Sequence, residues 1–80
     1  MNELRIYTNI EAPETLGGYP VFYSRRESGP YYRWSYNDVA RQWQAGRLRP
    51  AAVLPKVLAA AAWKTIPVPL KRSIAEHYQD

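Results

Sequence analysis

The side chains that could perform catalysis are few and scattered along this 80-residue sequence. One histidine, His77, lies near the C-terminus, and the only carboxylates close to it in sequence are Glu76 and Asp80. A catalytic or metal-binding histidine needs partners that orient it, and this spacing provides neither a triad nor a ligand set. We therefore interpret His77 as an exposed residue in the last turn of a helix, where the helix dipole favours a positive charge.

Other residue types that support catalysis show no suitable pattern. The sequence has no cysteine, which excludes a disulfide scaffold, a thiol nucleophile and thiolate ligands for zinc. Its four glycines do not form a phosphate-binding loop, and its serines have no neighbouring base that could activate them. We predict that the protein is not an enzyme and that it uses no cofactor, metal ion or small-molecule substrate.

Arginines interleaved with aromatic residues form the most informative chemical pattern in the sequence. Residues 25–72 carry ten basic groups against two acidic ones, whereas the segments before and after each have a net charge of −2. A guanidinium can bind a carboxylate or a phosphate through two hydrogen bonds, and a neighbouring tyrosine can stack on a ligand. The pattern predicts an acidic or polyanionic partner. The alternative is an ordinary solvated surface, since a net charge of +4 also favours solubility.

Part of this segment resembles GYF domains, which bind proline-rich peptides. The residues that carry the resemblance follow the order of that family: Gly29, Pro30, Ser35, Trp43, Ala45 and Gly46. Extra residues separate Pro30 from Ser35, and Arg47-Leu48 stands where the family has Tyr-Phe, so we do not assign the chain to it. The small size, the lack of catalytic motifs and the basic aromatic surface are also similar in type to anti-CRISPR proteins, inhibitors carried by phages and mobile elements.

Strands are predicted in the first half of the chain. Apolar and polar residues alternate over 4–10, which is typical of a strand with one buried face. Residues 21–24 and 31–36 are rich in aromatics and flank a polar Gly-Pro turn, which predicts a β-hairpin. If Trp34 faces the core, Tyr31 and Arg33 lie on the opposite face and are available for binding.

A helix is predicted directly after the hairpin. Ser35 and Asp38 have capping-box spacing, and the residues that would form one apolar stripe are Tyr36, Val39, Ala40 and Trp43. Gly46 would end this helix in a left-handed conformation, with Pro50 preventing its continuation.

The second half of the chain is predicted to be helical. It would contain one turn over residues 50–54, an alanine-rich helix over 55–64, an extended Ile66–Pro69 segment and a last helix over 69–78. The expected fold class is α+β: a small antiparallel sheet of two or three strands packed by two or three helices, with a helical C-terminal half. Residues 1–80 would form a single domain.

We interpret the sequence as a non-enzymatic interaction protein, of inhibitor or adaptor type, that occupies a surface on a larger macromolecule. The partner would be an acidic protein surface or a nucleoprotein complex, and the alternative is direct binding of nucleic acid by the same surface. With no secretory leader and no apolar run of membrane-spanning length, we expect a cytoplasmic protein with no membrane partner. The residues expected to contact the partner are Tyr23, Arg25, Arg26, Tyr31, Arg33, Arg41, Arg47 and Arg49.

Overall fold

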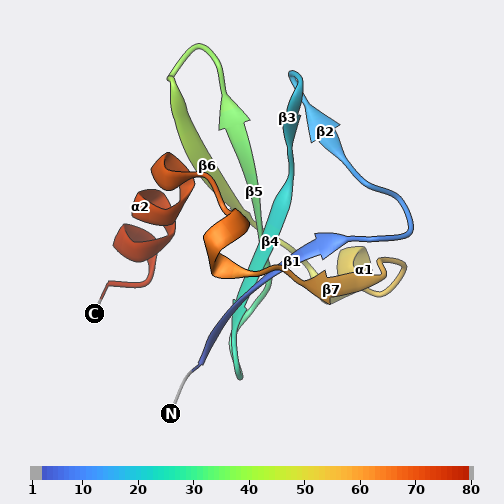
Figure 1. Cartoon of the computed structure of the whole chain (residues 1–80). Helices are drawn as coiled ribbons and strands as arrows, with labels where there is room; N and C mark the ends of the chain where they lie inside the picture. Colours follow the sequence, from blue (N-terminus) through green and yellow to red (C-terminus); the bar gives the residue numbers. More distant parts are fainter. Residues whose placement is uncertain (1–2, 80) are drawn as a thin grey trace.

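The computed structural model describes residues 3–79 and is dominated by antiparallel sheet (Figure 1). A five-stranded sheet has the order β6-β5-β4-β1-β7, and β2 pairs with β3 in a separate hairpin. The strands are β1 (Leu4–Asn9), β2 (Thr15–Leu16), β3 (Tyr19–Pro20), β4 (Phe22–Arg26), β5 (Tyr32–Asn37), β6 (Gln42–Arg47) and β7 (Leu58–Ala60). The helical segments are α1 (Pro50–Val53), a 3-10 turn η1 (Trp63–Thr65) and α2 (Val68–His77).

The predicted fold class is therefore wrong. The main sheet has five strands rather than two or three, and the C-terminal half contributes a strand as well as helix. Within the described residues, α2 is the only helix longer than one turn. Individual predictions are confirmed, namely the first strand, the hairpin of β4 and β5, the single turn of α1 and the last helix.

The predicted helix after the hairpin is instead the second half of another hairpin. Asn37 accepts hydrogen bonds from the amides of Val39 and Ala40 at 2.9 Å, which closes a tight turn, and Arg41 has a positive φ of 54°. Tyr36 and Trp43 are seven residues apart, so they share one face of a helix. The same spacing makes them direct cross-strand partners in the hairpin, where their ring centroids lie 5.6 Å apart.

Gly46 consequently does not end a helix. It lies in β6 opposite Arg33, and its φ is not positive. Val39, predicted to belong to the apolar stripe, is 96% exposed at the tip of the turn.

The alanine-rich segment is the other clear departure from the sequence prediction. Leu58–Ala60 pairs with β1 as an edge strand instead of forming a helix. Backbone hydrogen bonds from Ile10 to Val57 and from Ala61 to Ile6, each 2.9 Å long, extend that pairing. Helix propensity is a weak preference, and the free edge of β1 offers this segment a full set of hydrogen-bond partners. The segment Ile66–Pro69 is extended only at its start, because Val68 and Pro69 already belong to α2.

A Gly-Gly pair forms the turn between β2 and β3. Gly17 and Gly18 have φ values of 62° and 86°, a conformation that only glycine adopts without strain and that matches the twist of a tight hairpin. No strand was predicted for these residues from the sequence. It places Tyr19 against the β5–β6 hairpin, with ring centroids 4.5 Å from Tyr36 and 6.4 Å from Trp43.

The hydrophobic core lies between one face of the main sheet and the C-terminal segment. The buried core residues are Ile6, Phe22, Trp34, Trp43, Ile66, Leu70 and Ile74. A buried polar chain crosses this core: the Trp34 indole donates to the Ser24 hydroxyl at 2.8 Å, and the same hydroxyl lies 2.8 Å from that of Tyr78. Burial raises the pKa of Tyr78, so its hydroxyl stays protonated and able to share a hydrogen bond with Ser24. None of the described helices is long and apolar enough to cross a membrane.

Candidate binding surface

The face of the sheet opposite the core carries the arginine and tyrosine residues of the hairpin. Side chains alternate along a strand, so Trp34 on the core side places Arg33 on the other face. The register puts Arg5 opposite Arg25, and Tyr23 opposite both Tyr7 and Arg33. Arginines and tyrosines from three neighbouring strands thus share one side of the molecule. We call this side the open face.

Tyr23 lies at the centre of the open face, but it is fully buried. Its hydroxyl donates a short hydrogen bond to the Glu14 carboxylate, and the Lys56 ammonium lies 5.2 Å from its ring centroid and 3.4 Å from Glu14. The hydrogen bond from Tyr23 lowers the pKa of Glu14, while burial raises the pKa of Tyr23. This cluster joins the loop before β2 and the segment before β7 to the sheet, so its role is structural.

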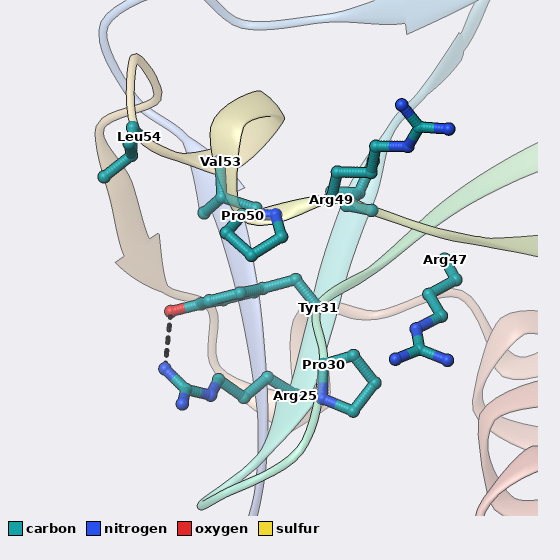
Figure 2. A pocket seen from close by; sticks show the side chains of 9 residues that line it. Arg25, Pro30, Tyr31, Arg47, Arg49, Pro50, Val53 and Leu54 are labelled. Carbon is teal, nitrogen blue, oxygen red and sulfur yellow. Dashed lines mark hydrogen bonds between the residues drawn. The ribbon is translucent and has the colours of Figure 1, made fainter.

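A groove lies at the end of the open face beside α1 (Figure 2). Its volume is about 800 Å³, which falls within the range of ligand-binding clefts. We call it the arginine groove, and its lining residues are Arg25, Pro30, Tyr31, Arg47, Leu48, Arg49, Pro50, Val53 and Leu54. Three of these residues are arginines, and none of the described lining residues is acidic. The apolar residues of the lining, which we call the apolar floor, are Pro30, Leu48, Pro50, Val53 and Leu54.

Tyr31 is the central side chain of the arginine groove. Figure 2 shows its ring between Pro50 on one side and Arg25 on the other. The Arg25 guanidinium donates to the Tyr31 hydroxyl at 3.3 Å and lies 4.8 Å from the ring centroid. On the open face, the Tyr7 ring lies 5.9 Å from that of Tyr31. These contacts hold the ring in place, which reduces the entropy that it would lose on binding a partner.

The local fold explains how the groove forms. The Leu48 amide donates to the Tyr31 carbonyl at 2.9 Å, which extends the β5–β6 pairing by one residue pair. Pro50 then begins α1, a position that suits proline because the first amide of a helix has no internal acceptor. The chain therefore turns immediately after β6, and Val53 and Leu54 become part of the apolar floor of the groove. Leu54 is 84% exposed, unlike an ordinary core leucine.

Arg25 is not fully satisfied by these contacts. Its Nε atom is buried and has no hydrogen-bond acceptor among the described residues. An unsatisfied buried donor is uncommon in a folded protein and requires an explanation. An ordered water or a ligand in the groove can supply the missing acceptor.

The structure brings together only some of the predicted contact residues. Arg25, Tyr31, Arg47 and Arg49 line the arginine groove, although the register puts Arg47 on the face toward α2. Arg33 lies on the open face, opposite Tyr23. Tyr23 is buried, so its side chain is not on the surface.

Two predicted contact residues lie elsewhere. Arg26 follows Arg25 in the strand and so lies on the core side, where it donates to the Tyr78 carbonyl and stacks 5.2 Å from the Tyr78 ring centroid. Arg41 lies in the β5–β6 turn, at the end of those strands opposite Arg47.

Sequence reasoning missed several residues of this surface. Arg5 and Tyr7 alternate with Leu4 and Ile6, whose side chains face the core. This period-two pattern is the signal by which the two residues could have been assigned to the open face. The apolar floor gave no such signal, because its residues become neighbours only after β6 is recognised as a strand.

The single histidine lies outside the arginine groove. His77 is exposed in the last turn of α2, as predicted, and its ring lies 4.5 Å from that of Tyr32 and 5.4 Å from that of Trp34. Asp80, its other candidate partner, lies outside the described residues. Over residues 3–79, no three histidine or acidic side chains lie close enough to hold a metal ion.

The groove can bind a carboxylate or a phosphate through bidentate hydrogen bonds from its guanidinium groups. It can also bind an apolar group by packing it on Tyr31 and the apolar floor. No protein-family model, curated protein or solved structure matches this chain.

Proposed function

We propose that this protein is a small binding domain, of inhibitor or adaptor type, that occupies an acidic site on a larger protein through the arginine groove. The observation that carries the proposal is the lining of the groove, which combines three arginines with an apolar floor and contains no described acidic residue. Tyrosine and arginine are the residues most often found at the energetic centres of protein interfaces.

The composition of the groove indicates what its partner offers. Each arginine can pair with a carboxylate through two hydrogen bonds, and Tyr31 with Val53 and Leu54 can cover an apolar side chain. The partner site would therefore combine acidic residues with at least one apolar residue. Electrostatic attraction would speed association, and apolar burial would slow dissociation.

A second candidate function is the binding of single-stranded nucleic acid. The observation that favours it is the pairing of Tyr7 and Tyr31 on the open face, together with arginines from three adjacent strands. Bases can stack on such rings while guanidinium groups contact phosphates. The groove favours a protein partner, because its apolar floor offers nothing to a phosphate backbone.

A displayed library of random 16-residue peptides tests the proposal. The protein is used to select binders, and each enriched peptide is then measured against a groove variant in which Arg25, Arg47 and Arg49 are all replaced by glutamine. The matched control replaces Arg41, Lys64 and Arg72 with glutamine. These residues lie outside the groove, and their replacement removes the same amount of positive charge. We expect the enriched peptides to be acidic and to contain apolar residues. Their affinity for the groove variant should be about tenfold or more lower than for wild type, and their affinity for the control should stay within about threefold of wild type.

Salt dependence separates the two candidates. The affinity of a 15-nucleotide oligo(dT) is measured over a range of salt concentrations, and about three phosphate contacts would give a log–log slope near −2. Oligo(dT) binding with that slope, lost in the groove variant, would favour the nucleic-acid function. If no selected peptide is both acidic and weaker on the groove variant, the proposed function is wrong.

A further inference from the structure

Strand β6 forms an open edge of the main sheet. It lies at one end of the strand order and pairs only with β5, over six residues from Gln42 to Arg47. The opposite edge, β7, is only three residues long. Proteins usually protect a long edge with proline, a bulge or an inward-pointing charge. β6 contains no proline, and its register with β5 runs without a bulge.

The hydrogen-bond pattern shows which backbone groups β6 leaves unpaired. The Leu48 amide bonds to the Tyr31 carbonyl, so that pair is of the hydrogen-bonded type. Pairs alternate along an antiparallel ladder, so Gly46, Gln44 and Gln42 also bond to β5. The amides and carbonyls of the intervening residues Trp43, Ala45 and Arg47 therefore point away from the sheet. No backbone hydrogen bond among residues 3–79 joins these groups to another segment.

A trough runs beside this edge. Its volume is about 610 Å³, and it lies between β6 and α2, which are neighbours in Figure 1. Its lining residues are Trp34, Gln42, Trp43, Gln44, Ala45, Ser73, Glu76 and His77. The small Ala45 side chain lies between those of Trp43 and Arg47 on the face toward α2, so there is room above it.

We propose that an extended peptide segment of a partner protein binds here as an added strand, paired with β6 and lying in the trough beside α2. The unpaired groups of Trp43, Ala45 and Arg47 supply the main-chain hydrogen bonds of this binding mode, in which pockets for alternate side chains give specificity. The trough is a cavity separate from the arginine groove, but Arg47 lines the groove and also flanks this edge. The variants that separate the two sites are therefore Tyr31→Ala for the groove and Ala45→Pro for the edge.

The side chains on the α2 side of β6 define the chemistry of that segment. An apolar residue of the peptide opposite Ala45 would pack between the rings of Trp34, Trp43 and His77. Two positions further along, the peptide would lie beside the exposed Arg47, which pairs with no described acidic residue. Because strand side chains alternate, the expected motif is an apolar residue followed or preceded at two positions by Asp or Glu.

The peptide library described above also tests this proposal, with Ala45→Pro as the probe variant. Proline removes the outward amide of residue 45 but leaves the bonds between β6 and β5 intact. The matched control, Ala45→Ser, keeps the amide and a small side chain. We expect a class of peptides with the apolar-x-acidic motif that bind Ala45→Pro about tenfold or more weakly, bind Ala45→Ser like wild type, and are unaffected by Tyr31→Ala.

Hydrogen exchange on the wild-type protein gives a second measurement that does not require Ala45→Pro to fold. The amides of Trp43, Ala45 and Arg47 should exchange rapidly in the free protein and become protected when a motif peptide is added. The amides of Gln44 and Gly46 point toward β5 and serve as internal references.

Three results would overturn the proposal. The first is a library that yields no motif class, and the second is a motif peptide that leaves these three amides unprotected. The third is a dimer in sedimentation that Ala45→Pro dissociates, because the edge would then belong to a second copy of the chain. Loss of the motif class would leave the groove-binding peptides unaffected, so the two proposals fail separately.

Discussion

The two faces of the five-stranded sheet use the same residue types for different ends. On the face toward α2, aromatic rings are buried: Trp34 is 2% exposed and packs with Phe22, Trp43 and the apolar residues of α2. On the open face, Tyr31 and Arg33 are only half-buried, and Tyr31 lines the arginine groove. An aromatic residue is therefore core or interface according to what covers its face, and strand alternation decides the face.

The difference between the two faces is clearest at Trp34 in β5 and at Tyr31, which directly precedes that strand. Replacing Trp34 with alanine should lower the free energy of unfolding by about 3–5 kcal/mol, because it leaves a cavity in the core and removes the partner of Ser24. Tyr31→Ala should lower it by about 1 kcal/mol, since that ring is only half-buried. Urea unfolding of both variants provides the measurement. Equal losses would mean that the open face is a second core.

The Tyr23 cluster is the part of the open face that acts as core, and it can be tested separately. Tyr23→Phe should lower the free energy of unfolding by about 1.5 kcal/mol, because the Glu14 carboxylate loses its hydrogen bond. A variant that melts like wild type would show that this bond does not stabilise the fold. Thermal denaturation at neutral pH measures the change.

The pH dependence of the same cluster has a defined sign. The folded state lowers the pKa of Glu14 from 4.5, so the stability that Glu14 contributes is present above that pH and is lost as the pH falls below it. The folded state raises the pKa of Tyr23 from 10.0, so this contribution is lost as the pH rises above 10. Tyr23→Phe should flatten both limbs of a plot of Tm against pH. Limbs identical to those of wild type would assign the pH dependence to other groups.

The smallest expected effect concerns Gly46, where the helix and strand interpretations disagree. As a left-handed helix stop, Gly46→Val would be destabilising by about 1–2 kcal/mol. In β6 the backbone needs no positive φ, and an added Cβ has no atom within 4 Å. We therefore expect a change within about 0.5 kcal/mol, or a small gain from a β-branched residue in a strand. A large loss would contradict the assignment of β6.

The sequence predicted local structure well where one pattern stood alone. Strict alternation in β1, the Gly-Pro turn and the apolar spacing of α2 each had a single interpretation, and each is confirmed. Tyr36 and Trp43 suited a helix and a hairpin equally, so their spacing could not distinguish the two. The alanine-rich segment was decided by the free edge of β1, which is information that lies 50 residues away in the chain.

The candidate site was also predictable only where a local pattern determined it. Tyr31 and Arg33 were placed on the face opposite Trp34 from alternation alone, and the structure has them there. Tyr23 was expected on the surface because nothing in the local sequence indicates that Glu14 and Lys56 cover it. The arginine groove could not be predicted, since its floor comes from Pro30, Leu48 and α1, which meet only through the β5–β6 pairing.

A charge exchange across the arginine groove tests the central claim most directly. Arg49→Glu is measured with an acidic peptide selected on wild type, and then with versions of that peptide in which one acidic residue at a time becomes arginine. The account predicts that the reversal weakens the original peptide by about tenfold or more, and that one arginine-bearing version recovers affinity to within about threefold. If every version recovers equally, or none does, the groove does not hold its partner through specific arginine–carboxylate pairs.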